Sequence, residues 1–322
     1  MTRPIEAEGL VRRFGDVVAV DGVDLMVDEG EIFGFLGPNG AGKSTIVRML
    51  TTLLKPTAGR AWVAGHDVVE EAGAVRRAIG VALQDAAIDP LMTGRELLRL
   101  QAVLHGISRS EADRRGDVLL ERVGLVGAAN RRVGTYSGGM RRRLDLALSL
   151  VHEPSVLFLD EPTTGLDPTS RSALWEEVRR LNSDGTTVFL TTQYLEEADE
   201  LAARVAIIDN GRIVREGQPA TLKASIGADT LVVTVGADHE VRAAEVLARF
   251  GSNRAAKTGS VAIGIDGGAA ALSGALRALE DAGIAVEHVE LDAPSLDDVF
   301  ADATGRRLEG AEGGDGAPEA VA

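Results

Sequence analysis

One short segment, residues 37–45, constrains the fold more than any other part of the chain. It reads GPNGAGKST, follows a strand-like apolar run at residues 31–36 and leads into a helical pattern at residues 44–54. Glycines let backbone N–H groups curl around phosphate oxygens, and a helix start adds partial positive charge. A chance glycine turn before a helix is the alternative, but the strand, loop and helix in this order favour a phosphate-binding site in an α/β fold.

The residue types in this segment indicate different roles for its residues. Lys43 is expected to reach the β- and γ-phosphates of a nucleotide, and the Ser44 hydroxyl is expected to ligate Mg²⁺. The expected nucleotide-binding residues of the loop are Gly37, Pro38, Asn39, Gly40, Ala41, Gly42, Lys43, Ser44 and Thr45.

A second chemical feature is the apolar run at residues 156–159, which ends in Asp160 and Glu161. Asp160, at the carboxyl end of a predicted buried strand, is placed to hold Mg²⁺ through water beside the phosphate loop. Glu161 is expected to polarise the attacking water as general base. A strand that simply stops at charged surface residues is the alternative, and the preceding phosphate loop favours the functional interpretation.

Composition restricts the possible partners. The chain has 322 residues with 34 Lys and Arg against 49 Asp and Glu, a net charge of −15, and it has no cysteine. Disulfides, thiolate nucleophiles and cysteine metal sites are therefore excluded, and bulk electrostatic binding of nucleic acid is disfavoured. No apolar run approaches the length of about 18 residues needed to span a bilayer, and the acidic N-terminal segment does not resemble an export signal.

The pattern along the chain predicts two structured parts and a tail. Short apolar runs at 79–83, 156–159, 187–190 and 205–208 are typical of a parallel sheet buried on both faces. Helical periodicity between them predicts a helical subdomain, about residues 88–152, within a domain at 1–220. Strand and helix patterns alternate again in a small α/β unit at 221–308. The acidic, glycine-rich segment 309–322 is predicted to be a disordered tail.

A serine–glycine turn precedes another predicted helix. Ser137 is a candidate N-cap, and Gly138 and Gly139 expose backbone N–H groups that can bind an anion. An ordinary helix cap would explain this turn in isolation. The phosphate loop, the S-G-G helix start and the apolar run ending in D-E, in this order, resemble the ATP-binding-cassette (ABC) ATPases over roughly residues 4–218.

The resemblance implies an ABC-type P-loop NTPase core that binds ATP and Mg²⁺ between two cassettes. In this arrangement Ser137, Gly138 and Gly139 of one subunit close over the nucleotide of the other. It implies adenine stacking for Phe14, Mg²⁺ and partner sensing for Gln84, and a place at the dimer interface for Asp167. From the residues alone, Phe14 could be a core aromatic, Gln84 a polar residue that ends a strand, and Asp167 a helix cap before Pro168.

The sequence departs from the family where most members carry a histidine that contacts the γ-phosphate. Gln193 follows Thr191 and Thr192 here, and none of the five histidines falls at this place. A glutamine amide can donate a hydrogen bond but cannot carry a titrating proton. The sequence therefore predicts hydrolysis that uses Glu161, Lys43 and Gln193 without imidazole chemistry.

The segment around Gln193, the YSGGM motif and the added C-terminal unit with LDDVF at residues 296–300 resemble the daunorubicin-resistance type of drug exporter. This resemblance implies an ATPase subunit that works as a homodimer with an integral-membrane permease at the cytoplasmic face of the membrane. It implies regulation or subunit assembly for LDDVF, whereas the pattern alone fits an amphipathic helix capped by Ser295. Export of another hydrophobic or lipid cargo and a non-transport ABC ATPase remain alternatives.

Overall fold

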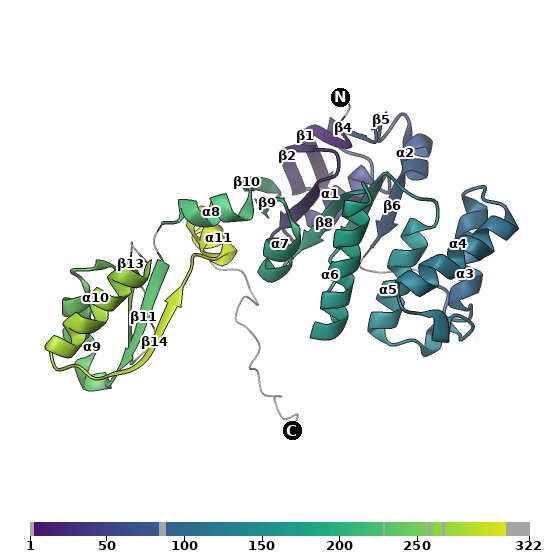
Figure 1. Cartoon of the computed structure of the whole chain (residues 1–322). Helices are drawn as coiled ribbons and strands as arrows, with labels where there is room; N and C mark the ends of the chain where they lie inside the picture. Colours follow the sequence, from purple (N-terminus) through teal and green to yellow (C-terminus); the bar gives the residue numbers. More distant parts are fainter. Residues whose placement is uncertain are drawn as a thin grey trace, which may run out of the picture. The chain divides into compact units, whose positions relative to one another are not determined.

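The computed structural model describes residues 3–83, 88–227, 229–254, 256, 259–265 and 268–306. The chain forms two compact units, the first ending at Gln218 and the second beginning at Pro219 (Figure 1). The tail predicted at 309–322 lies outside the described residues. Among the described residues, no helix is both long enough and apolar enough to cross a bilayer.

A six-stranded sheet forms the centre of the first unit. Its order is β10 (Arg212–Gly217), β9 (Arg204–Asp209), β3 (Ile32–Leu36), β8 (Thr187–Thr192), β7 (Val156–Asp160) and β6 (Ile79–Ala82). The strands are parallel except for β10, which pairs antiparallel with β9. The carboxyl ends of β3, β7 and β8 therefore meet at one edge, where ligands bind in open α/β sheets.

The central strands are apolar throughout because both faces of the sheet are covered. Phe33, Phe35, Phe158 and Phe189 alternate onto one face, with Phe189 within 5.5–5.7 Å of the other three ring centroids. The intervening residues, among them Leu157 and Val188, join a separate apolar cluster on the opposite face. The α/β class with a parallel sheet, predicted from these runs, is confirmed.

The phenylalanine face is covered by a helix, which the sequence predicted at residues 44–54, and by a second sheet, which the sequence patterns did not predict. The second sheet is antiparallel, in the order β2 (Val17–Val27), β1 (Ile5–Phe14), β4 (Ala58–Val63) and β5 (His66–Asp67). Helix α1 (Lys43–Leu50) contributes buried side chains to one apolar cluster with both sheets. It ends earlier than the predicted residue 54, because Thr52 takes a left-handed backbone conformation with φ +67°.

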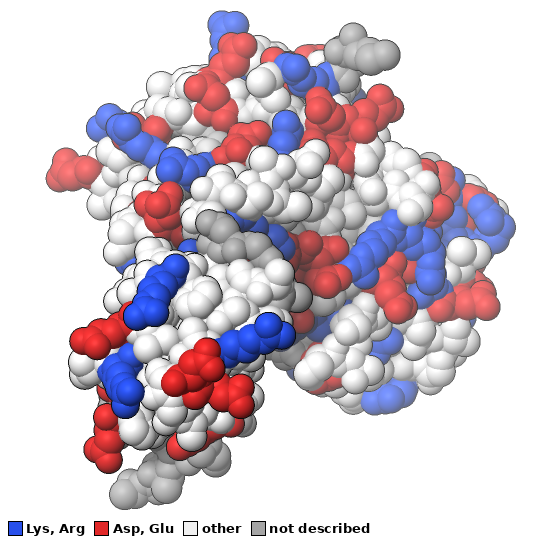
Figure 2. Space-filling model, turned by 60° about the vertical axis from the view of Figure 1, so that its left-hand side comes forward, with Lys and Arg blue, Asp and Glu red and all other residues white. Residues whose placement is uncertain are grey.

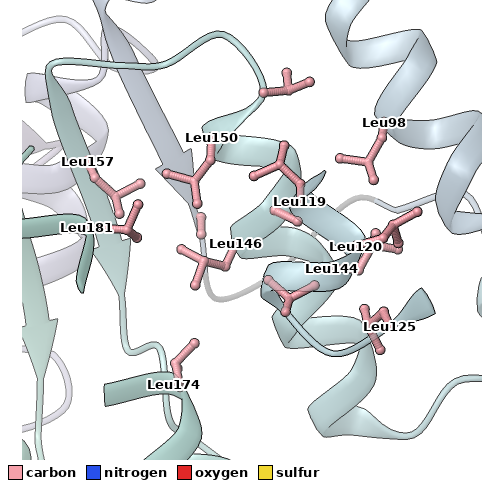
Figure 3. Close-up of a cluster of buried hydrophobic side chains, with 14 of the residues drawn as sticks. Leu98, Leu119, Leu120, Leu125, Leu144, Leu146, Leu150, Leu157, Leu174 and Leu181 are labelled. Carbon is pink, nitrogen blue, oxygen red and sulfur yellow. The ribbon is translucent and has the colours of Figure 1, made fainter. Parts of the chain in front are cut away.

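Helices cover the opposite face. They are α3 (Gly94–Leu104), α4 (Arg109–Arg122), α5 (Gly138–Leu150), α6 (Pro168–Ser183) and α7 (Leu195–Leu201), with α2 (Ala72–Ala78) preceding β6. Side-chain oxygens cap four of the helix starts: Thr93, Ser108, Ser137 and Asp167. Leucines from α3, α4, α5 and α6 pack with Leu157 of β7 (Figure 3). This packing joins the helices to the central sheet.

The second unit has its own fold and its own core. Its β-α-β-β-α-β elements are β11 (Asp229–Val235), α9 (Glu240–Leu247), β12 (Gly251–Arg254), β13 (Ser260–Ile265), α10 (Gly268–Asp281) and β14 (Val286–Asp292). The antiparallel order β12-β13-β11-β14 is the split βαβ arrangement. Apolar side chains of β11 and β13 pack with those of α9 and α10.

Two helices flank this sheet in the chain, α8 (Pro219–Ser225) and α11 (Leu296–Thr304), and they contact each other. Helix α11 contains the LDDVF segment, and Ser295 forms a capping box with Asp298 at its start. Leu296, Val299 and Phe300 are buried. The amphipathic, Ser295-capped helix expected from the pattern is therefore present.

Surface charge is mixed on the face of the molecule shown in Figure 2. Basic and acidic side chains are interspersed there. The described residues on this face thus lack the continuous basic surface that is typical of proteins that hold nucleic acid by charge.

Candidate nucleotide-hydrolysis site

The loop between β3 and α1 has the backbone geometry of a phosphate cradle. Gly40 and Gly42 have φ angles of +80° and +108°, which L side chains rarely adopt. A Cβ on Gly37 would lie 2.4 Å from the carbonyl oxygen of Ile208, and one on Gly42 would lie 2.5 Å from that of Ala19. Space therefore requires glycine at both positions, and at Gly42 the backbone conformation requires it as well.

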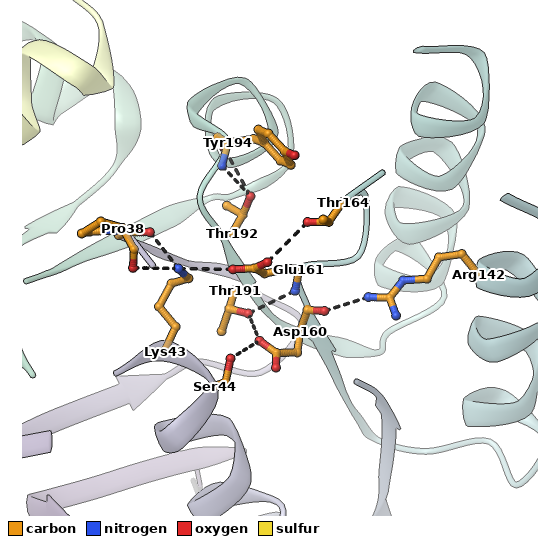
Figure 4. A network of polar contacts seen from close by, with 11 residues as sticks. Pro38, Lys43, Ser44, Arg142, Asp160, Glu161, Thr164, Thr191, Thr192 and Tyr194 are labelled. Atoms are coloured by element: carbon orange, nitrogen blue, oxygen red, sulfur yellow. Dashed lines mark hydrogen bonds and ion pairs between the residues drawn. The ribbon is translucent and has the colours of Figure 1, made fainter. Parts of the chain in front are cut away.

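Lys43, the first residue of α1, points back across this loop (Figure 4). Its Nζ donates to the carbonyl oxygens of Gly37 at 2.8 Å and Pro38 at 3.1 Å, and it lies 3.3 Å from Glu161 Oε1. Lys43 is 4% exposed. Burial lowers the pKa of Lys43, and the charge of Glu161 partly opposes that shift. The ammonium group is thus held between the phosphate loop and the carboxylate predicted as general base.

Asp160, the last residue of β7, accepts hydrogen bonds from two hydroxyl groups at its Oδ1 atom. Ser44 Oγ donates at 3.2 Å and Thr191 Oγ1, from the neighbouring strand β8, donates at 2.5 Å. The structure therefore brings together two of the three predicted metal-site residues, Ser44 and Asp160, whereas the third, Gln84, lies outside the described residues. Thr191 was not predicted as a site residue, because the apolar run of β8 gave its hydroxyl no distinguishing pattern.

The oxygen atoms of Ser44 and Asp160 fit Mg²⁺, which prefers hard oxygen ligands and is commonly held by one or two protein groups together with substrate phosphates and waters. Among the described residues, no group of three or more His, Cys, Asp or Glu side chains could hold a metal ion alone. The donor set therefore suits a metal ion that arrives with the nucleotide.

Glu161 follows Asp160 directly and turns the chain sharply. Its φ of +49° is unusual for a residue with a side chain. Its backbone N–H donates to the carbonyl oxygen of Thr191 at 3.0 Å, and Thr164 Oγ1 donates to its Oε2 at 3.4 Å. Glu161 is 6% exposed. These contacts direct its carboxylate towards Lys43 at the phosphate loop.

The end of β8 places Gln193 at the same edge of the sheet. Thr192 Oγ1 accepts a hydrogen bond from the backbone N–H of Tyr194 at 2.9 Å, which fixes the turn around the half-buried Gln193. Glu197, in α7, is fully buried and accepts from Trp175 Nε1 at 3.1 Å. Burial raises the pKa of Glu197. Glu197 was not predicted to be buried, since it belongs to an acidic run in the sequence.

The serine–glycine turn begins α5. Ser137 accepts a hydrogen bond from the backbone N–H of Met140 at 3.2 Å. Gly138 has open space where a Cβ would lie, whereas a Cβ on Gly139 would lie 2.9 Å from Ser170 Oγ. A pocket of about 210 Å³ lies between this turn and the segment that follows β7, lined by Gly138, Arg141, Arg142, Glu161, Thr164, Gly165 and Leu166.

Of three further predicted residues, the structure describes two, Asp167 and Phe14. Asp167 caps α6, accepting from the backbone N–H and the hydroxyl of Ser170, and these hydrogen bonds lower its pKa. Phe14 is 46% exposed at the end of β1, with the Arg12 guanidinium 4.5 Å from its ring centroid, so it is not a core residue. Gln84 lies outside the described residues.

The comparisons with known proteins agree with this geometry. Residues 20–164 match the ABC transporter family, and residues 217–304 match the C-terminal domain of DrrA1-3-like ATP-binding proteins. The chain is 49% identical to the daunorubicin resistance ATP-binding protein DrrA3 of Streptomyces coeruleorubidus, over 94% of this chain and 96% of the relative. It is 54% identical to the daunorubicin/doxorubicin resistance protein DrrA of Streptomyces peucetius, over 71% and 70% of the two chains.

Solved structures support the same assignment. A dimeric ATP-binding cassette bound to ADP and phosphate in a post-hydrolysis state is 27% identical, with a TM-score of 0.62, and covers 66% of this chain and 98% of its own. The predicted ABC fold and ATPase activity are thereby confirmed. The chain belongs to the ATP-binding subunits of ABC transporters, in the branch of the daunorubicin-resistance ATP-binding proteins.

Proposed function

We propose that this chain hydrolyses Mg²⁺-bound ATP to energise the efflux of a hydrophobic drug through a separate integral-membrane permease. The observation that carries the proposal is the convergence of Lys43, Ser44, Asp160 and Glu161 at the carboxyl edge of the central sheet. The names of the relatives, which include daunorubicin and doxorubicin resistance proteins, support a drug as cargo.

In this proposal each residue has a separate task. The loop N–H groups and Lys43 hold the phosphates, and electrostatic stabilisation of their developing charge provides most of the catalysis. Ser44 and Asp160 hold Mg²⁺, which neutralises phosphate charge when bound. Glu161 accepts a proton from the attacking water, and the Gln193 amide donates a hydrogen bond to the γ-phosphate.

Two copies of the chain bind two nucleotides in the working state, at the cytoplasmic face of the membrane. Ser137, Gly138 and Gly139 of one copy contact the phosphate held by the other, with Gln84 and Asp167 near the shared surfaces and Phe14 on the adenine. The dimeric cassette among the structural neighbours supports this arrangement. Glu161→Gln should trap ATP and increase the dimer fraction measured by light scattering. A dimer fraction unaffected by ATP in this variant would contradict the assignment of the base.

Drug accumulation in cells tests the transport proposal. Cells that express this chain with its cognate permease should accumulate less daunorubicin than cells with the Lys43→Ala variant. Lys55→Ala is the matched control, because it removes another of the only four lysines and Lys55 is exposed. Equal accumulation with the wild-type chain and Lys43→Ala would exclude this drug as cargo.

A further inference from the structure

Arg142 is a buried cation that the assigned chemistry does not use. It lies in the first half of α5, the helix that begins at the serine–glycine turn, and its side chain is 12% exposed. Its guanidinium donates to three backbone carbonyl oxygens: Leu83 at 2.6 Å, Asp160 at 2.7 Å and Pro162 at 2.9 Å. The guanidinium is a planar fork, and each of its three nitrogens donates to a different one of these acceptors, a spread that the single ammonium nitrogen of a lysine does not provide.

The acceptors of Arg142 surround the catalytic segment. The carbonyl groups of Asp160 and Pro162 flank Glu161 on either side in the chain, and the carbonyl of Leu83 lies just beyond the end of β6. Figure 4 shows the guanidinium directed at the backbone of Asp160, on the side of this segment away from Lys43. One side chain therefore joins α5 to the ends of two parallel strands.

The backbone at Glu161 depends on such support. A non-glycine residue at φ +49° is in a sparsely populated conformation, which persists only where the surroundings hold it. The backbone N–H of Glu161 is fixed by Thr191, and Arg142 fixes the carbonyl groups on both sides. The direction in which the Glu161 carboxylate points is thus set partly by a residue of α5.

A buried carboxylate holds Arg142 itself in place. Asp145 Oδ2, one helical turn along α5, lies 3.4 Å from Arg142 Nη1. Burial raises the pKa of Asp145 to about 6, and the charge of Arg142 acts in the opposite direction. The guanidinium is therefore fixed from its own helix as well as from the strands.

We infer that Arg142 is a positioning residue that couples the serine–glycine turn of α5 to the Glu161 carboxylate in the same chain. Because Ser137 starts the helix that carries Arg142, a nucleotide contact at the turn displaces the backbone around Glu161 through a single guanidinium. The inference rests on the proposed role of Glu161 as general base.

A kinetic comparison of Arg142→Met with the wild-type chain tests the coupling. Because a misplacement of about 1 Å can reduce a rate 100-fold, we expect kcat for ATP hydrolysis to fall about 10- to 100-fold, with the Kd of a fluorescent ATP analogue changing less than about 2-fold. Arg142→Lys, which keeps the charge but loses the fork, should restore only part of kcat. Arg143→Met is the control, because the guanidinium of Arg143 bonds the distant carbonyl of Val123 at 2.9 Å on the same helix.

A double-mutant cycle separates positioning from a loss of stability. If Arg142 acts through Glu161, adding Arg142→Met to Glu161→Gln should lower the residual kcat less than about 2-fold, since groups that act as a unit are not additive. Additive losses, or a wild-type kcat in Arg142→Met, would overturn the inference. A wild-type kcat in Glu161→Gln alone would instead overturn the assignment of the base.

Discussion

At the scale of single residues, two hydrogen bonds hold Asp160, the proposed Mg²⁺ ligand, in place. The Oδ1 atom of Asp160 accepts hydrogen bonds from both Ser44 Oγ and Thr191 Oγ1. A hydrogen bond to a charged group contributes about 1.5–3 kcal/mol, more than a neutral one. Thr191 is therefore as much a part of the site as the residues found by sequence motif.

Replacing Thr191 tests this role. Thr191→Val keeps the shape of the side chain and removes the donor to Asp160, so we expect kcat at limiting Mg²⁺ to fall about 10-fold, in line with a lost charge-assisted hydrogen bond. Thr191→Ser keeps the donor and should retain most of the activity. A steady-state ATPase assay over a Mg²⁺ titration provides the measurement, and equal activity in the two variants would show that the hydroxyl has no catalytic effect.

Because residue 193 is a glutamine, we predict that the pH dependence of ATP hydrolysis differs from that of an enzyme with an imidazole at this position. Wild-type ATPase activity should show no inflection that depends on residue 193, because an amide does not titrate. Gln193→His should introduce an inflection within about one pH unit of 6.5, the ordinary pKa of histidine.

The pH–rate profiles of the wild-type chain, Gln193→His and Gln193→Ala provide the measurement. Full activity in Gln193→Ala would show that the amide makes no required contact. An inflection common to all three proteins would have to arise from another group.

At the scale of elements, a pair of histidines lies where α3 and α5 meet the central sheet. The His105 and His152 rings stack with centroids 3.8 Å apart, and His152 Nε2 lies 2.9 Å from the carbonyl oxygen of Ile79. Burial lowers the pKa of both rings, and His105 lowers that of His152 further. Packing between these elements therefore favours the neutral form of both histidines.

Acidification should weaken this packing. Because the folded-state pKa of His152 lies below its ordinary value, the unfolded chain binds the proton first as the pH falls through about 6.5, and stability is lost there. We expect the Tm of the wild-type chain to fall more between pH 7.5 and 5.5 than the Tm of His152→Gln. Thermal unfolding at the two pH values measures this difference.

The exposed His288 of β14 provides the control, and His288→Gln should follow the wild-type chain. Asp145, with its pKa of about 6, titrates in the same range but is common to all three proteins. A Tm decrease in His152→Gln as large as that of the wild-type chain would contradict the assignment to His152.

At the scale of the whole molecule, the candidate nucleotide-binding and catalytic residues belong to the first unit, together with the apolar clusters around them. The second unit has its own core. A chain that ends at Gln218 should therefore fold and bind ATP with a Kd within about 3-fold of the full chain. Fluorescence titration of a nucleotide analogue checks this, with Lys43→Ala in the shortened chain as the non-binding control. A folded but non-binding shortened chain would show that the second unit contributes to the nucleotide site.

The sequence predicted the strands that are buried on both faces, because continuous apolar runs are typical of such strands. It also predicted the phosphate loop and the carboxylates Asp160 and Glu161 from their order along the chain. It did not predict the sheet of β1, β2, β4 and β5, because β1 mixes polar and apolar residues and its pairing has register shifts. Arg142 was one of three consecutive arginines, and Thr191 was one hydroxyl in an apolar run. Their roles depend on which strands lie adjacent, and that arrangement is a tertiary property.

Lys43 and Glu161 form a buried ion pair that partly neutralises the charge of the site. Each charge has the other as its counter-ion, and separating two buried charges is unfavourable unless a replacement partner arrives. In the proposed mechanism the γ-phosphate is such a partner for Lys43, so binding of the substrate draws the ammonium group away from the Glu161 carboxylate. In that mechanism, part of the binding energy of ATP is used to free the Glu161 carboxylate for its proposed role as base.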